Sequence, residues 1–156
     1  ELHSGQGIHP VGRLDIDSTG AIILTNDGEL TFWLTHPRHS IPKTYRVLVE
    51  GHPTESVIRT WRQGVVLDGR KTRPAQVKLI KNFADTTCLE IVLKEGNRQI
   101  RRVAEILGHP VIKLHRTAIG PIQLKLPGNK PLLEGEYRHL EESEIRFLQK
   151  VKADSY

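Results

Sequence analysis

A polar segment at residues 11–20 contains residue types that can do chemistry. It places Arg13, Asp15 and Asp17 between two glycines, directly before an apolar run at residues 21–24. A carboxylate that is held in such a loop can act as a covalent nucleophile. The same residues are also compatible with a surface turn that contains a local Asp–Arg pair, an interaction of little energetic value.

A second segment places three arginines at the start of an expected helix over residues 98–107. Arg98, Arg101 and Arg102 lie at the end of the helix where the dipole disfavours cations. Because the three side chains fall within about one helical turn, the sequence either tolerates an electrostatic cost or binds an anion with them. We favour the interpretation that these arginines bind an anion.

The charge balance indicates the same kind of partner. The chain has 23 Lys and Arg against 18 Asp and Glu, which gives a net charge of +5. Up to Lys130 the bases outnumber the acids by 19 to 12, whereas the remaining residues have four bases and six acids. A basic body of this kind favours a polyanion, although it also promotes solubility. Eight aromatic residues are few for a protein that binds single strands by stacking alone.

Length and composition exclude several classes of protein. With 156 residues, 37% of them hydrophobic and 26% charged, the chain fits one globular domain. Its apolar runs are too short for a membrane span, and its first fifteen residues lack the apolar core of a secretory signal. The single Cys88 excludes an internal disulfide and a cysteine-based zinc site. We therefore expect a cytoplasmic protein with no membrane partner.

The pattern of apolar residues and turn signals predicts an α+β domain with a mixed, mostly antiparallel sheet and flanking helices. No repeat or linker interrupts it. Helices are expected at residues 29–34, 54–63, 98–107 and 141–151, and strands at residues 21–25, 43–50, 65–67, 76–80, 87–94, 111–114 and 122–126.

Three motifs follow one another in a defined order. They are Gly-Arg-Leu-Asp at residues 12–15, Lys-Thr-Tyr-Arg-Val at residues 43–47, and Glu-Gly-Asn-Arg-Gln-Ile-Arg-Arg-Val at residues 95–103. In order and spacing they resemble the motifs of the RsuA/RluB/RluE/RluF family of ribosomal RNA pseudouridine synthases. The third motif is one residue shorter than the family pattern, which indicates a tighter loop at Gly96. The family's upstream Asn-Lys-Pro strand and N-terminal RNA-binding domain have no counterpart, so residues 1–156 are expected to form the catalytic domain alone.

The resemblance implies a pseudouridine synthase fold with a catalytic cleft across the sheet. It also implies an isomerase that converts a uridine of ribosomal RNA to pseudouridine, with no metal and no cofactor. Asp15 then matches the essential carboxylate, which attacks the ribose C1′ or stabilises a glycal-like intermediate. Arg101 matches the cation that keeps this carboxylate ionised, and Tyr45 the ring that stacks on uracil and offers a hydroxyl for proton transfer. Without the motif, Tyr45 would be an inward-facing strand residue and Arg101 a surface residue of its helix.

The remaining basic residues of the motifs are expected to contact RNA. Arg13 is placed to fill the gap left by the flipped base. Backbone phosphate contacts are expected from Lys43, Arg98, Arg102 and Arg116. The chain is expected to act as a monomer on ribosomal RNA. An alternative of a different class is a non-catalytic RNA-binding or ribosome-assembly module that kept the fold, and a more remote one is an unrelated basic domain.

Overall fold

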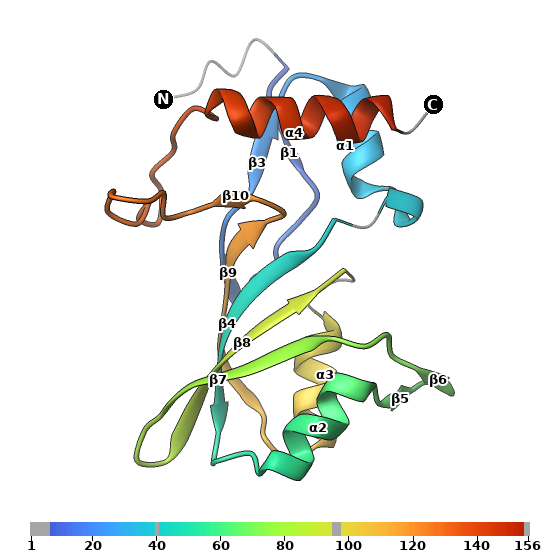
Figure 1. Cartoon of the computed structure of the whole chain (residues 1–156), viewed down its shortest axis with the longest axis vertical. Helices are drawn as coiled ribbons and strands as arrows, with labels where there is room; N and C mark the ends of the chain where they lie inside the picture. The colour runs from blue at the N-terminus through green and yellow to red at the C-terminus, as the bar shows by residue number, and fades with distance from the viewer. Residues whose placement is uncertain (1–6, 40, 95–97, 155–156) are drawn as a thin grey trace.

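The computed structural model describes residues 7–39, 41–94 and 98–154. The chain forms two halves, which share the long strands β4 (Lys43–Glu50) and β9 (Val111–Ile119) and are joined at a narrower waist (Figure 1). Each half has its own cluster of buried apolar side chains. The shared strands place residues of both halves at this waist.

The main sheet has the strand order β10–β9–β4–β8–β7, in which all neighbours are antiparallel. Its other strands are β7 (Gln76–Asn82), β8 (Thr86–Leu93) and β10 (Ile122–Gln123). The short strand β2 (Ser18–Gly20) adds to β9 in parallel. The expected α+β class with a mixed, mostly antiparallel sheet is therefore confirmed.

The lower half packs two helices against this sheet. In α2 (Glu55–Gln63) the Thr54 hydroxyl caps the first turn by accepting a hydrogen bond from the Val57 amide at 3.2 Å. Ile58 and Trp61 are buried on the inner face of α2. Helix α3 (Arg98–Ile106) buries three residues on one face, Ile100, Val103 and Ala104, which leaves its arginines on the other faces.

The upper half contains a two-stranded ribbon of β1 (His9–Val11) and β3 (Ile23–Thr25). Helices α1 (Gly28–Thr35) and α4 (Glu142–Ala153) contact each other in this half, and a 3-10 turn, η2 (Pro37–His39), follows α1. Glu144 in the first turn of α4 is buried and accepts two hydrogen bonds from the Arg138 guanidinium, at 2.7 and 2.8 Å. This pair fixes the C-terminal helix to the segment that leads into it.

Several strands differ from the sequence prediction. The strand expected at residues 111–114 continues to Ile119. Arg116 interrupts the apolar pattern of this strand, but it is buried and its Nε donates to the Ala21 carbonyl. The strand expected at residues 122–126 ends at Gln123, and β1, β2 and β6 (Arg70–Lys71), which pairs with β5 (Val66–Leu67), were not predicted. These unpredicted strands have two or three residues each, too few to show a period of two. No helix in the described part of the chain is long and apolar enough to span a membrane.

Candidate active site

Asp15 lies in the turn between β1 and β2. The turn is closed by a hydrogen bond from the Ser18 amide to the Asp15 carbonyl at 2.9 Å. The Asp15 side chain is about one-third exposed, and its Oδ1 lies 3.8 Å from the Nε of Arg98 at the start of α3. The carboxylate thus has a cation beside it and remains accessible to a substrate.

Arg101 contacts the same turn at a different point. Its Nη2 donates to the Asp17 carbonyl at 3.0 Å and to the Ser18 hydroxyl at 3.3 Å. The ion pair expected between Arg101 and Asp15 is therefore wrong for this structure, in which Arg98 is the cation within ion-pair distance of the carboxylate. The reason is geometric: the turn passes α3 so that its backbone, and not its carboxylate, meets the Arg101 guanidinium. The buried Nε of Arg101 has no acceptor among the described residues.

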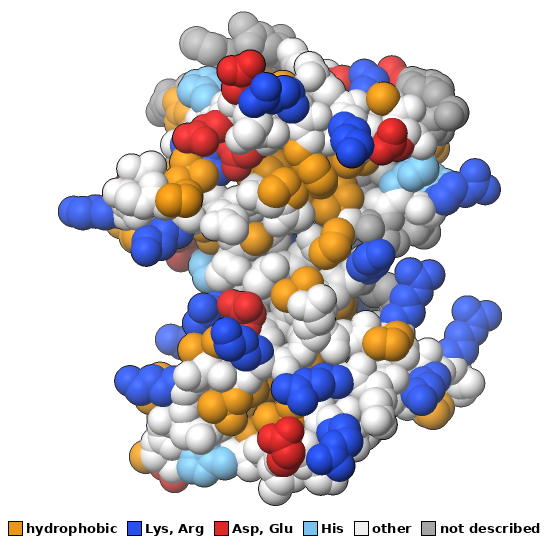
Figure 2. Space-filling view, viewed as in Figure 1, with side chains coloured by type: hydrophobic (Ala, Val, Ile, Leu, Met, Phe, Trp, Pro, Cys, Tyr) orange, Lys and Arg blue, Asp and Glu red, His pale blue; other side chains and the backbone are white. Residues whose placement is uncertain are grey.

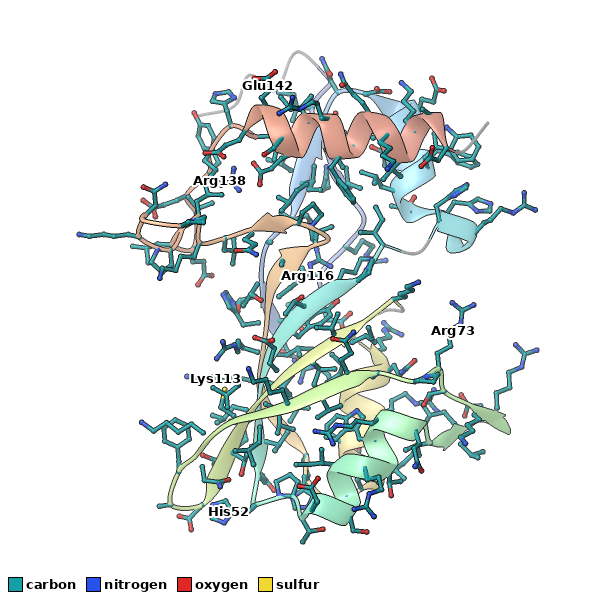
Figure 3. The ribbon with its side chains drawn as sticks, viewed as in Figure 1. His52, Arg73, Lys113, Arg116, Arg138 and Glu142 are labelled. Atoms are coloured by element: carbon teal, nitrogen blue, oxygen red, sulfur yellow. The ribbon has the colours of Figure 1, made fainter. Side chains whose placement is uncertain are left out.

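Tyr45 and Arg116 form a cross-strand pair beneath this turn. They lie directly opposite each other on β4 and β9, next to a register shift between Thr44 and Tyr45. The Tyr45 side chain is almost completely buried, and Arg116 is only 5% exposed, with its Nε donating to the Ala21 carbonyl at 2.9 Å. Figure 3 places Arg116 at the waist of the molecule. A bulge of this kind redirects side chains, and here it sets a guanidinium beside a phenol.

The electrostatics place Asp15 in the same neighbourhood. Burial raises the pKa of the Tyr45 phenol, the charge and hydrogen bond of Arg116 oppose this rise, and the Asp15 carboxylate adds to it. Burial also lowers the pKa of the Lys43 ammonium, and the charge of Arg116 lowers it further. Asp15 of the first motif and Lys43 and Tyr45 of the second thus belong to one electrostatic cluster with Arg116, which lies after the third motif.

Three of the residues expected to contact phosphates are buried, half-buried or paired with a carboxylate in this structure. Arg116 is buried beside Tyr45, and Lys43 is half-buried with its Nζ donating to the Ile41 carbonyl at 3.2 Å. Arg102 donates two hydrogen bonds to the Asp68 carboxylate, both at 2.8 Å. Arg13 is exposed next to the Asp15 turn. The outward role expected for Arg116 is therefore wrong, because its register on β9 points it to the interior.

Sequence reasoning also missed the part played by Ser18 and Ala21. Ser18 bonds to Arg101, and the Ala21 carbonyl bonds to Arg116, so both hold arginines of other segments. A signal was present in the sequence, since both residues directly follow the Asp15 motif. It could not be used because the partners lie more than eighty residues away.

A large hollow of about 1220 Å³ lies between β2, β3, β10 and the segment that precedes α4, and its lining includes Leu14 and Ser18 of the Asp15 turn. His115 lines it, whereas the adjacent Arg116 points to the other face of β9, and Asp15, Tyr45 and Arg116 are not among its lining residues. Among the described residues, no group of three His, Cys, Asp or Glu side chains could hold a metal ion.

Comparison with known proteins connects this cluster to a family. The model of the RNA pseudouridylate synthase family matches residues 1–105, two-thirds of the chain. The chain belongs to the RNA pseudouridylate synthase family. Within it, the chain is similar to the ribosomal large subunit pseudouridine synthase B of Bacillus subtilis, with 39% identity over 92% of this chain. It is 40% identical to the ribosomal large subunit pseudouridine synthase E of Xanthomonas axonopodis pv. citri, covering 75% of this chain and 70% of that protein.

Solved structures agree with the family assignment. The crystal structure of a pseudouridylate synthase superimposes with a TM-score of 0.80 and 34% identity, covering 95% of this chain and 62% of the other. The RNA pseudouridylate synthase fold predicted from the motifs is thereby confirmed. The chain spans 58% of the length of the Bacillus relative.

Proposed function

We propose that this chain is the catalytic domain of a ribosomal RNA pseudouridine synthase, with Asp15 as its essential carboxylate. The observation that carries the proposal is the arrangement around the Asp15 turn. Arg98 and Arg101 of the third motif contact this turn, and Tyr45 of the second motif interacts with Asp15 and lies opposite Arg116. Family membership supports the same reaction, since relatives of this chain are named for pseudouridine formation in ribosomal subunits. A non-catalytic binding module would have no need for a carboxylate, a buried phenol and a buried guanidinium in one place.

The reaction is an isomerisation that needs no co-reactant. The N1–C1′ bond of the uridine breaks, the base turns, and a C5–C1′ bond forms. The C5 proton leaves to solvent, and N1 takes up a proton. A carboxylate suits this sequence because it can attack C1′ or stabilise the positive charge that develops there. The Asp15 side chain is partly exposed, so a ribose can reach it, and the Arg98 guanidinium lies 3.8 Å away.

Tyr45 and Arg116 are proposed to hold the base and to assist proton transfer. Because burial raises the pKa of Tyr45, its phenol stays protonated at neutral pH and can donate a hydrogen bond. The stacking on uracil that the motif implies requires the ring to become accessible on RNA binding, because it is almost completely buried in this structure. Arg116 bonds to the Ala21 carbonyl and thereby remains beside the phenol.

Arg101 is proposed as a positioning residue for the Asp15 turn. Its bonds to the Asp17 carbonyl and the Ser18 hydroxyl hold the backbone two and three residues after Asp15. Arg13, Lys43 and Arg98 are proposed to contact the RNA. The catalytic unit is proposed to act as a monomer on ribosomal RNA in the cytoplasm.

The test is to map pseudouridine in ribosomal RNA of both subunits. Unmodified transcripts are incubated with the protein or with the Asp15→Asn variant, and C5 tritium release is measured. We expect a site-specific pseudouridine with the protein and a rate at least about 1000-fold lower with the variant, since losing a covalent catalyst costs several kcal/mol. RNA binding without any pseudouridine would support the non-catalytic alternative instead.

A further inference from the structure

A basic hairpin beside the site has no part in the proposed chemistry. It comprises residues 65–73, with β5 and β6 as its strands, and projects from the lower half of the molecule (Figure 1). Arg70, Lys71 and Arg73 are its basic residues and are exposed, and Asp68 is its single acidic residue. We refer to it as the β5–β6 hairpin.

The base of the β5–β6 hairpin is fixed to the end of α2. The Thr72 amide donates to the Val65 carbonyl at 2.8 Å, and the Val65 amide donates to the Thr72 hydroxyl at 2.9 Å. Gly64 has a φ of +108°, and a Cβ there would collide with the Thr72 carbonyl. The two ends of the hairpin are thus held against each other at a close backbone approach.

The turn of the hairpin is tied to α3 by one ion pair. Asp68 has a left-handed backbone with a φ of +52°. Its carboxylate accepts two hydrogen bonds from Arg102, both at 2.8 Å. A bidentate pair fixes orientation as well as distance. Because Arg102 balances the charge of Asp68, the charges that the hairpin presents outward are basic.

Helix α3 connects this turn to the Asp15 carboxylate. Arg98 and Arg102 are four residues apart, about 6 Å along the helix axis. Arg98 lies beside Asp15, and Arg102 holds Asp68. The space-filling view shows Lys and Arg side chains along the margin that carries the hairpin, and Arg73 points from the hairpin side towards the waist (Figures 2 and 3). The basic residues of the hairpin therefore border the approach to the site.

We infer that the β5–β6 hairpin is an RNA-contact arm. Arg70 and Lys71 bind backbone phosphates of the RNA that flanks the target uridine, and the Asp68–Arg102 pair holds the arm in place. The identity of the polyanion rests on the proposed function. Arg102 consequently acts on RNA through the hairpin and not as a phosphate contact of its own.

The arm is tested by the salt dependence of binding to unmodified ribosomal RNA transcripts. Each phosphate contact in a single-stranded region contributes roughly −0.7 to the slope of log affinity against log salt. Arg70→Gln with Lys71→Gln should flatten the slope by about 1.4. The matched control is Lys125→Gln with Lys130→Gln, two exposed charges around the loop that follows β10 on the opposite side of the molecule (Figure 1). An equal change in both double variants, or none in the hairpin variant, overturns the inference.

The Asp68–Arg102 pair is tested by the sign of a single substitution. Asp68→Asn removes the ion pair and keeps the left-handed turn, which asparagine tolerates. If the pair positions the arm, Asp68→Asn binds RNA about threefold to tenfold more weakly, and its Thr72 amide hydrogen exchanges faster. The double variant with Arg102→Ala then binds RNA as tightly as Asp68→Asn alone. If Arg102 is itself the phosphate contact, Asp68→Asn frees it and binding tightens, which contradicts the inference. Pseudouridine formation by the unsubstituted protein is scored separately, so a failure of the proposed function is distinguished from a failure of the arm.

Discussion

Tyr45 and Arg116 lie directly opposite each other across β4 and β9, and both are buried at the waist of the molecule. A register shift in β4–β9 pairing adjoins Tyr45, and the Arg116 guanidinium is held by the Ala21 carbonyl. The sheet therefore positions a phenol and a guanidinium as a cross-strand pair, and the Asp15 carboxylate of the neighbouring turn acts on the same phenol. We therefore expect the titration of the Tyr45 phenol to be distinguishable from that of the other tyrosines.

The Tyr45 phenol is expected to titrate at higher pH than an exposed tyrosine, because burial is the largest influence on its pKa. Ultraviolet titration of the protein and of Tyr45→Phe gives this transition by difference. Arg116→Gln should move the transition further upward, since the arginine opposes the effect of burial. A Tyr45 transition at the ordinary value of 10.0 would contradict the buried placement.

Substitutions of Arg98 and Arg101 are expected to affect different properties, RNA affinity and turnover rate, although the two residues are only three positions apart. Arg101→Ala removes two bonds to the Asp15 turn and should lower single-turnover rates at saturating RNA by about 10- to 100-fold. Arg98 is 85% exposed, so Arg98→Ala should chiefly weaken binding and flatten the salt slope by about 0.7 to 0.9. Arg101→Lys serves as the control, because it keeps the charge and loses the planar donor group. Full activity of Arg101→Ala at saturating RNA would contradict its positioning role.

Gly20→Ala is expected to destabilise the fold by about 2 kcal/mol or more. Gly20 has a φ of +128°, and a Cβ there would meet the Arg116 backbone, where β2 runs beside β9. Gly28→Ala is a matched control at the start of α1, since no atom lies within 4 Å of its added Cβ. Urea unfolding of both variants measures the difference. Equal stabilities would show that β2 is not packed against β9 in this way.

The Arg138–Glu144 pair predicts a pH dependence of stability. Hydrogen bonds from Arg138 lower the pKa of Glu144 below 4.5, and burial opposes this. The stabilisation is thus fully present above pH 4.5 and is lost as the pH falls through the lowered pKa. Glu144→Gln should lower the free energy of unfolding by about 3 kcal/mol at neutral pH. This difference in stability from the unsubstituted protein should disappear in acid. Urea midpoints from pH 7 to pH 3 measure it, and a gap that does not change with pH would contradict it.

Local sequence determined the elements whose signals lie within a few residues. The apolar pattern and turn signals predicted a strand at residues 43–50 and a helix at residues 54–63, and the structure has β4 at Lys43–Glu50 and α2 at Glu55–Gln63. Such signals need no partner, because a cap or an apolar face is encoded by neighbours in the chain. The three motifs likewise indicated the family from residue types alone.

Only the tertiary structure decided which arginine meets which group. Arg98 and not Arg101 lies beside Asp15, Arg102 holds Asp68, and Arg116 faces inward to Tyr45. These pairings join residues that are 34 to 83 positions apart in the chain, and each depends on strand register or helix position. The residue types show that an arginine can pair with a carboxylate. Because the Coulomb energy of an ion pair falls with distance, only the packed structure determines which partner it has.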